Sequence, residues 1–132
     1  MKNLMKAITT QFKTTNSLNT ALSGRMYPHE ALQGVSFPYG VYYLISHEYD
    51  ENFTDIYEYA NIQFSLFSDK DSVDEIVTLY GYLTALFDDA ILSVTGYTML
   101  KFKRSSASLM RDSEHGTWHY AVDYDVILEG EK

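Results

Sequence analysis

Residues 117–128 constrain the fold more than any other segment, because their polarity alternates from one position to the next. The odd positions include the polar residues His119, Asp123 and Asp125. The even positions are all apolar or aromatic: Trp118, Tyr120, Val122, Tyr124, Val126 and Leu128. A period of two is that of a β-strand with one face in the core and one face toward water. We therefore expect a long strand with its even side chains buried and Asp123 and Asp125 in solvent.

The length and composition indicate a folded chain of one domain, residues 1–132. Hydrophobic residues make up 45% of the sequence and aromatic residues 15%, which argues against disorder. The twelve tyrosines suit half-buried sheet faces and protein interfaces equally well, since tyrosine has an apolar ring and a polar tip.

The charge balance argues against nucleic acid as a specific partner. Ten basic residues stand against eighteen acidic ones, for a formal charge of −8, whereas nucleic-acid binders need clustered cations. The one basic cluster comprises Lys101, Lys103, Arg104 and, further on, Arg111, and we expect it to form a single solvated strand face. Cysteine is absent, which excludes disulfides and thiolate metal sites. We expect neither a signal peptide nor a membrane span.

Two segments have the apolar spacing of amphipathic helices. The first spans residues 3–22, is rich in Thr, Asn and Ser at its middle, and should stop at Gly24. The second is predicted at 72–88, where Ser72 and Glu75 have the spacing of a capping box. Asp88 and Asp89 then stand at the end of the helix that is unfavourable for negative charge.

The remaining segments alternate as strands do. Within them, Glu58 interrupts an apolar face and is expected near a frayed strand end. The predicted strands lie within 25–38, followed by an ordered loop, and at 39–48, 56–67, 97–110 and 117–128, with turns at 50–54 and 111–116. This order predicts an α+β domain: a mostly antiparallel sheet of four to five strands with two helices packed on one face.

No set of residues predicts catalysis or a cofactor. His115 and His119 would lie about 13 Å apart on a strand, too far to share a metal, and His29 and His47 occur in separate segments. The carboxylate pairs Asp88/Asp89 and Asp123/Asp125 fit a helix end and a solvated strand face better than an acid–base couple. Phosphate-loop, dinucleotide and Gly-x-Ser-x-Gly patterns are missing. We therefore expect no catalytic, cofactor-binding or metal-ligating residues.

Three stretches, at 30–39 (EALQGVSFPY), 62–68 (IQFSLFS) and 118–124 (WHYAVDY), together resemble the tail-completion, or tail-terminator, proteins of long-tailed bacteriophages and prophages. The resemblance runs from about Tyr27 to Leu128. The more specific parts are Phe37-Pro38-Tyr39 entering a strand and the join between a strand and a helix at 68–75. The family often has a proline where this chain has Leu32, so the shape of that loop is expected to differ.

The resemblance implies a structural protein and no enzyme. Such proteins form a ring, commonly a hexamer, on the finished tail tube, where they stop tube growth and offer the surface that joins the head. The implied partners are further copies of the chain, the tail tube protein and a head-completion or connector protein, with no sequence-specific nucleic acid and no membrane. The implied location is the host cytoplasm during assembly and then the head–tail junction of the virion. Two alternatives stay open: a head-completion or adaptor protein, and a small cytoplasmic enzyme or ligand-binding domain.

Overall fold

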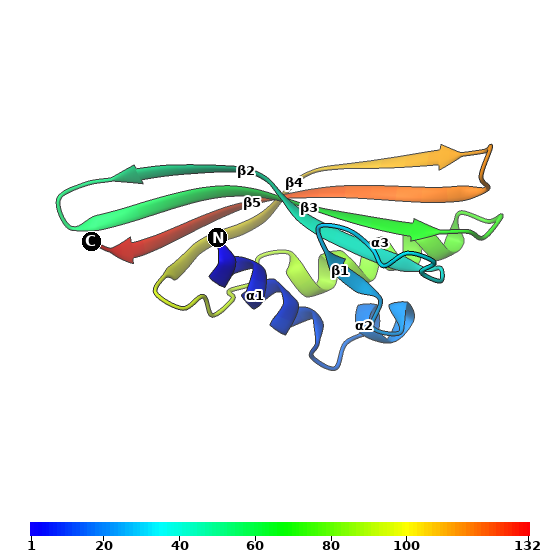
Figure 1. Ribbon diagram of the computed structural model, residues 1–132, viewed down its shortest axis with the longest axis horizontal. Coiled ribbons are helices and arrows are strands. Elements are labelled where there is room, and N and C mark those ends of the chain that lie inside the picture. Colours follow the sequence, from blue (N-terminus) through cyan, green and yellow to red (C-terminus); the bar gives the residue numbers. More distant parts are fainter.

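The computed structural model describes residues 1–132 and contains a five-stranded sheet covered on one face by helices (Figure 1). The strands are β1 (Met26–Pro28), β2 (Tyr39–Glu51), β3 (Asp55–Ser68), β4 (Thr98–Asp112) and β5 (Thr117–Glu131), in the spatial order β1-β2-β3-β5-β4. Only β1 and β2 are parallel; the other neighbours are antiparallel. The helices are α1 (Lys2–Phe12), α2 (Ser17–Leu22) and α3 (Asp74–Phe87). The predicted α+β class with a mostly antiparallel sheet is confirmed.

The single helix predicted at 3–22 is wrong, because the chain forms α1 and α2 with a break between them. Thr14 and Asn16 cause the break by bonding local backbone: Thr14 Oγ1 donates to the Gln11 carbonyl at 2.7 Å, and Asn16 Oδ1 accepts from the Asn19 amide at 2.8 Å. Such side chains compete with helical hydrogen bonds in a helix interior and favour a new N-cap. The apolar stripe survives the break, since its members are buried: Leu4, Ile8, Phe12, Leu18 and Leu22.

The helix predicted at 72–88 is present as α3, but its capping box is wrong. Ser72 Oγ accepts from the Asp74 amide at 3.2 Å, and Glu75 does not reach back to Ser72. Instead, the Glu75 carboxylate accepts from the Ser68 hydroxyl at 2.6 Å, because Ser68 is fully buried at the end of β3 and needs a partner. Glu75 thus fastens the start of α3 to the sheet.

The core lies between the sheet and the three helices, as the alternation of β5 predicts. Val122, Tyr124, Val126 and Leu128 are buried, while Trp118 and Tyr120 are partly buried against the same core. Its centre is aromatic, with the ring centroids of Phe64 and Phe87 4.6 Å apart and those of Phe64 and Tyr124 5.5 Å apart. Offset and edge-on ring pairs of this kind add to the energy of simple burial.

Asp123 and Asp125 lie on the opposite face, as expected, but they are only partly exposed. Gln63 Nε2 donates to Asp123 at 2.9 Å, and Asn61 Nδ2 donates to Asp125 at 3.1 Å. The sequence could not show these contacts, since they depend on the register between β3 and β5.

The strands are longer than predicted, and their two hairpins extend toward opposite ends of the molecule (Figure 1). Between β2 and β3 the turn narrows to residues 52–54, and β5 continues to Glu131. Glu58 therefore stands inside β3 rather than at a frayed end; it is buried, and its carboxylate lies 2.9 Å from His47 Nε2. The same carboxylate raises the pKa of the neighbouring Tyr97 phenol through a hydrogen bond. None of the three helices has the length and apolar character needed to span a membrane.

Candidate interaction surface

Two strand edges of the sheet are open. β1 pairs with β2 only at Gly40–Tyr42, so the segment Tyr43–Glu51, here called the β2 edge, pairs with β3 alone. On the other side, the Asp89 amide donates to the Phe102 carbonyl at 3.0 Å, but the segment Lys103–Asp112, here called the β4 edge, has backbone bonds to β5 alone. Open edges present unpaired amide and carbonyl groups that can accept another strand.

Both edges carry exposed apolar side chains. On the β2 edge, Ile45 is 51% exposed and Tyr49 56%. On the β4 edge, Leu109 is 40% exposed and Met110 44%. The hairpin between β2 and β3 ends in Phe53, whose side chain is completely exposed. Apolar side chains grouped on open edges and hairpin tips indicate surfaces that meet another protein.

The two edges differ in charge. The β2 edge carries three carboxylates, on Glu48, Asp50 and Glu51. The β4 edge carries three cationic side chains, on Lys103, Arg104 and Arg111, with Asp112 at its end. Opposite charge on two different edges favours contacts between unlike edges over contacts between like ones.

The predicted basic cluster on β4 is divided between the two faces of the sheet, so the expectation of one solvated face is wrong. Lys101 and Lys103 stand opposite Ile127 and Asp125 on the face without helices. Arg104 stands opposite Tyr124 on the helix side, where its guanidinium lies 3.1 Å from Asp88. Arg111 lies over the Trp118 ring, 4.8 Å from its centroid. The register shift between Arg104 and Ser106 is a β-bulge, which redirects side chains along a strand.

Asp88 closes a polar network at the end of α3. The buried Tyr124 hydroxyl donates to Asp88 Oδ1 at 2.6 Å, and Arg104 pairs with the other carboxylate oxygen. Arg104 also donates to the Tyr80 hydroxyl, and the Tyr80 ring stacks on Tyr120 with centroids 4.2 Å apart. Burial, followed by the hydrogen bond to Asp88, raises the pKa of Tyr124 above its ordinary value. Asp88 is thus bound into the structure by β4 and β5, which accounts for a carboxylate at this helix end.

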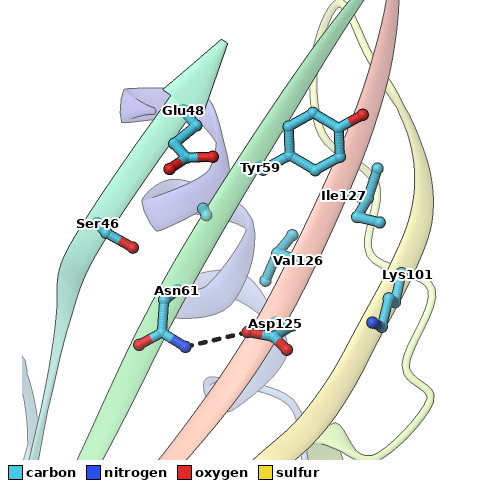
Figure 2. A pocket seen from close by; sticks show the side chains of 9 residues that line it. Ser46, Glu48, Tyr59, Asn61, Lys101, Asp125, Val126 and Ile127 are labelled. Atoms are coloured by element: carbon cyan, nitrogen blue, oxygen red, sulfur yellow. Dashed lines mark hydrogen bonds between the residues drawn. The ribbon is translucent and has the colours of Figure 1, made fainter. Parts of the chain in front are cut away.

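The helix-free face of the sheet, which carries Tyr59, Asn61 and Asp125, has a shallow depression of about 320 Å³ (Figure 2). Its lining is mainly polar and comes from all four long strands. In Figure 2, Asn61 points toward Asp125, and Lys101 stands across from them on β4. Because the depression lies on an open sheet face and Asn61 and Asp125 already bond each other, it fits a protein surface better than a small-ligand pocket.

An aromatic row crosses the same face near the β4–β5 turn. Tyr39, Phe67 and His119 stack in sequence, with centroids 4.8 and 4.4 Å apart, and Phe37 lies 5.2 Å from Tyr39. Burial in this row lowers the pKa of His119. The alternation of residues in the sequence predicts aromatic sheet faces but not this stack, which requires three strands in register.

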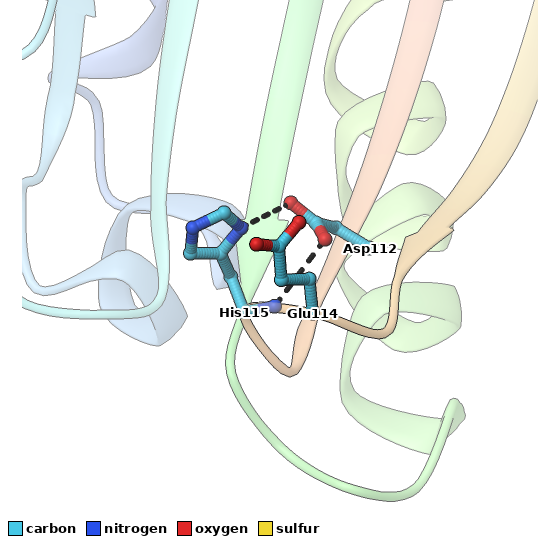
Figure 3. Close-up of side chains that lie close together, drawn as sticks. All are labelled: Asp112, Glu114 and His115. Atoms are coloured by element: carbon cyan, nitrogen blue, oxygen red, sulfur yellow. Dashed lines mark hydrogen bonds and ion pairs between the residues drawn. The ribbon is translucent and has the colours of Figure 1, made fainter.

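The histidines are dispersed, as their spacing predicts. His115 lies in the β4–β5 turn beside Asp112 and Glu114, all three exposed (Figure 3). Its Nδ1 is 2.8 Å from Asp112 Oδ2, and this hydrogen bond lowers the pKa of the Asp112 carboxyl. The Asp112 carboxylate also accepts from the His115 amide at 3.3 Å, so the cluster braces its own turn. His119 lies in the aromatic row, and His47 pairs with Glu58.

Comparison with known proteins identifies the family to which this chain is similar. The family model described as tail completion protein gp17 matches residues 6–129. A solved chain from the virion of a native gene transfer agent particle has a similar fold, with a TM-score of 0.72, 12% identity and 92% of each chain covered. A second solved chain has a TM-score of 0.52 at 12% identity, with 97% of this chain and 95% of that chain covered. No curated protein sequence matches.

The family match covers most of the chain, including all five strands apart from the last residues of β5. The resemblance seen in the sequence is thereby confirmed. The two solved chains support the fold, since similarity at this level of identity speaks to architecture alone. The chain belongs to the tail completion protein gp17 family and is a structural protein of a phage tail.

Proposed function

We propose that this protein forms a ring on the end of the finished tail tube, where it stops tube growth and provides the surface that joins the head. The observation that carries the proposal is the family match over residues 6–129. The structure supports it with two open edges of opposite charge on one subunit, because a ring requires two different patches that meet head to tail. The partners would be further copies of the chain, six in all as in the ring common in the family, the tail tube protein and a head-completion protein.

The helix-free face is suited to line the channel of such a ring. It carries Asp123, Asp125 and Glu129 on β5 and Glu48 on β2. A channel with negative walls repels DNA phosphates and lets a genome pass without adhering. The helices would then form the outside of the ring, where the circumference is larger. In this role the protein needs no catalytic residue, cofactor, metal or membrane, and it reads no nucleic-acid sequence.

Deletion of the gene, followed by electron microscopy of the particles, tests the proposal. Without the protein, tail tubes should exceed their normal length or tails should fail to join heads, and expression from a plasmid should restore both. Labelled protein should locate to the head–tail junction of complete virions, after assembly in the host cytoplasm. Normal, joined tails in the deletion strain would refute the proposal. Tubes of normal length that fail to join heads would instead support the head-completion or adaptor alternative.

A further inference from the structure

We propose that neighbouring subunits join by antiparallel pairing of the β2 edge of one copy with the β4 edge of the next. The sheet would then continue from subunit to subunit around the ring. This inference rests on the proposed ring and names the contact that closes it.

The strand directions fit this contact. β2, β3, β5 and β4 alternate in direction because each neighbouring pair is antiparallel. β2 and β4 therefore run in opposite directions at opposite sides of the sheet. Rotation about a ring axis keeps the strand direction of every copy, so β2 of the next copy arrives beside β4 as an antiparallel strand and extends the alternation. Pairing of two β4 edges would need a two-fold axis and would close a dimer instead.

The side chains match better in the antiparallel direction than in the parallel one. When the two edges overlap along their whole length, Asp50 and Glu51 of one copy fall beside Lys103 and Arg104 of the next. Ile45 then falls beside Leu109 and Met110. Parallel overlap would place Asp50 beside Met110, and Ile45 would fall beside Ser105. Antiparallel overlap therefore buries apolar side chains that are 40–51% exposed in a single copy and sets opposite charges side by side.

Of the cationic side chains on the β4 edge, Lys103 is the one most available to form an ion pair with the next subunit. Its one ion pair is a 4.0 Å approach to Asp89, and both side chains are exposed. Arg104, in contrast, is already held by Asp88 and Tyr80. Like edges carry like charges, so β2–β2 and β4–β4 contacts are disfavoured while β2–β4 contacts are favoured.

The position of the edges fits a closed ring. The β2 edge lies toward one end of the sheet and the β4 edge toward the other (Figure 1). Two copies paired through these edges are therefore offset along their strands. A sheet closes only when its strands are tilted and each step is staggered in this way. Register shifts between Leu44 and Ser46 in β2 and between Arg104 and Ser106 in β4 add the local bend and twist that curvature requires.

Paired charge reversals test the contact. One variant carries Lys103→Glu, and the other carries Asp50→Lys; both side chains are exposed. Ring formation would be measured by native mass spectrometry in solution and by electron microscopy on purified tail tubes. For each variant alone, the amount of assembled ring should fall at least tenfold relative to the wild type, because every interface then brings like charges together.

An equimolar mixture of the two variants should restore the ring. In an alternating ring, each acidic β2 edge meets an unmodified β4 edge, and each lysine-bearing β2 edge meets a glutamate-bearing β4 edge. The mixed rings should therefore contain equal numbers of both variants. A single chain with both substitutions should also assemble. In wild-type rings, hydrogen exchange of backbone amides should slow at the β2 and β4 edges relative to the free subunit.

The control is Lys6→Glu, which makes the same change in net charge as Lys103→Glu at an exposed position on α1, and which should assemble normally. If wild-type rings form and both edge variants assemble like the wild type, the proposed edge contact is wrong, but the proposed ring function is still supported. Failure of the mixture to rescue, or unchanged exchange at both edges, would also overturn the contact. If the wild type forms no ring even on tail tubes, the proposed function itself fails. Equal denaturation midpoints for all variants establish that loss of assembly is not loss of folding.

Discussion

The two aspartates that follow α3 should differ sharply in their contribution to stability. Asp88 accepts a hydrogen bond from the Tyr124 hydroxyl and pairs with Arg104, whereas Asp89 is 75% exposed and approaches only Lys103. Asp88→Ala would leave the hydroxyl of the fully buried Tyr124 without an acceptor. An orphaned buried hydroxyl costs about 1–3 kcal/mol, and loss of the half-exposed ion pair adds up to about 1 kcal/mol.

We therefore expect Asp88→Ala to lower the free energy of unfolding by about 1–4 kcal/mol. Tyr124→Phe should cost about 1–2 kcal/mol, because Asp88 keeps Arg104 and contact with water after the hydroxyl is removed. The double variant should lose less than the sum of the two single losses by about 1–2 kcal/mol, since both remove the same hydrogen bond.

Urea denaturation followed by the fluorescence of Trp118, the single tryptophan, measures all three losses. The matched control is Asp89→Asn, which keeps a side chain tolerant of the positive φ of 57° at this position. It should change stability by less than about 0.5 kcal/mol. Additive single losses, or equal effects at Asp88 and Asp89, would refute the network as described.

Three further predictions concern the core, α3 and the aromatic row. Val122→Asp should unfold the protein, because an unpaired carboxylate at a position with no exposure costs several kcal/mol; folded protein by circular dichroism would contradict the facing of β5. Gly81→Ala should stabilise by about 1 kcal/mol in thermal denaturation, since the added methyl group meets no atom within 4 Å and alanine is the better helix former; a lower midpoint would contradict the open surroundings of Gly81. Stability should fall as the pH drops below about 6.5, because burial lowers the pKa of His119 while the unfolded histidine takes up a proton at its ordinary pKa. His119→Gln should remove this part of the pH dependence, and an unchanged slope would locate the proton uptake elsewhere.

Local patterns in the sequence predicted most elements of the fold. The alternation at 117–128 predicted β5 and its buried face, and the apolar spacing after Ser72 predicted α3. These predictions succeeded because the core imposes the strand and helix periods directly on the residues that enter it. The break after Phe12 was missed even though its cause, a run rich in Thr, Asn and Ser, is visible in the sequence. The apolar stripe continues across the break, so periodicity could not detect it.

The interaction surface was only partly predictable. The sequence showed tyrosine-rich faces and the basic residues of β4, but it could not show that Arg111 stands opposite Trp118 on the helix side, because the bulge between Arg104 and Ser106 changes which face each later residue occupies. In the sequence, Glu58 interrupts an apolar strand face; in the structure, its carboxylate pairs with His47 of the neighbouring strand. Both outcomes depend on contacts between residues far apart in the chain.

By itself, the sequence determined the class of fold, the buried face of β5 and the family, since these depend on the order and period of side chains along the chain. Only the tertiary structure decided the spatial order of the strands, and with it which edges remain open. β1 covers three residues of β2 and leaves the rest free, and the loop after α3 donates a backbone hydrogen bond to β4 at Phe102. Edge exposure is a property of the whole sheet, because a strand is open only where no other strand lies beside it.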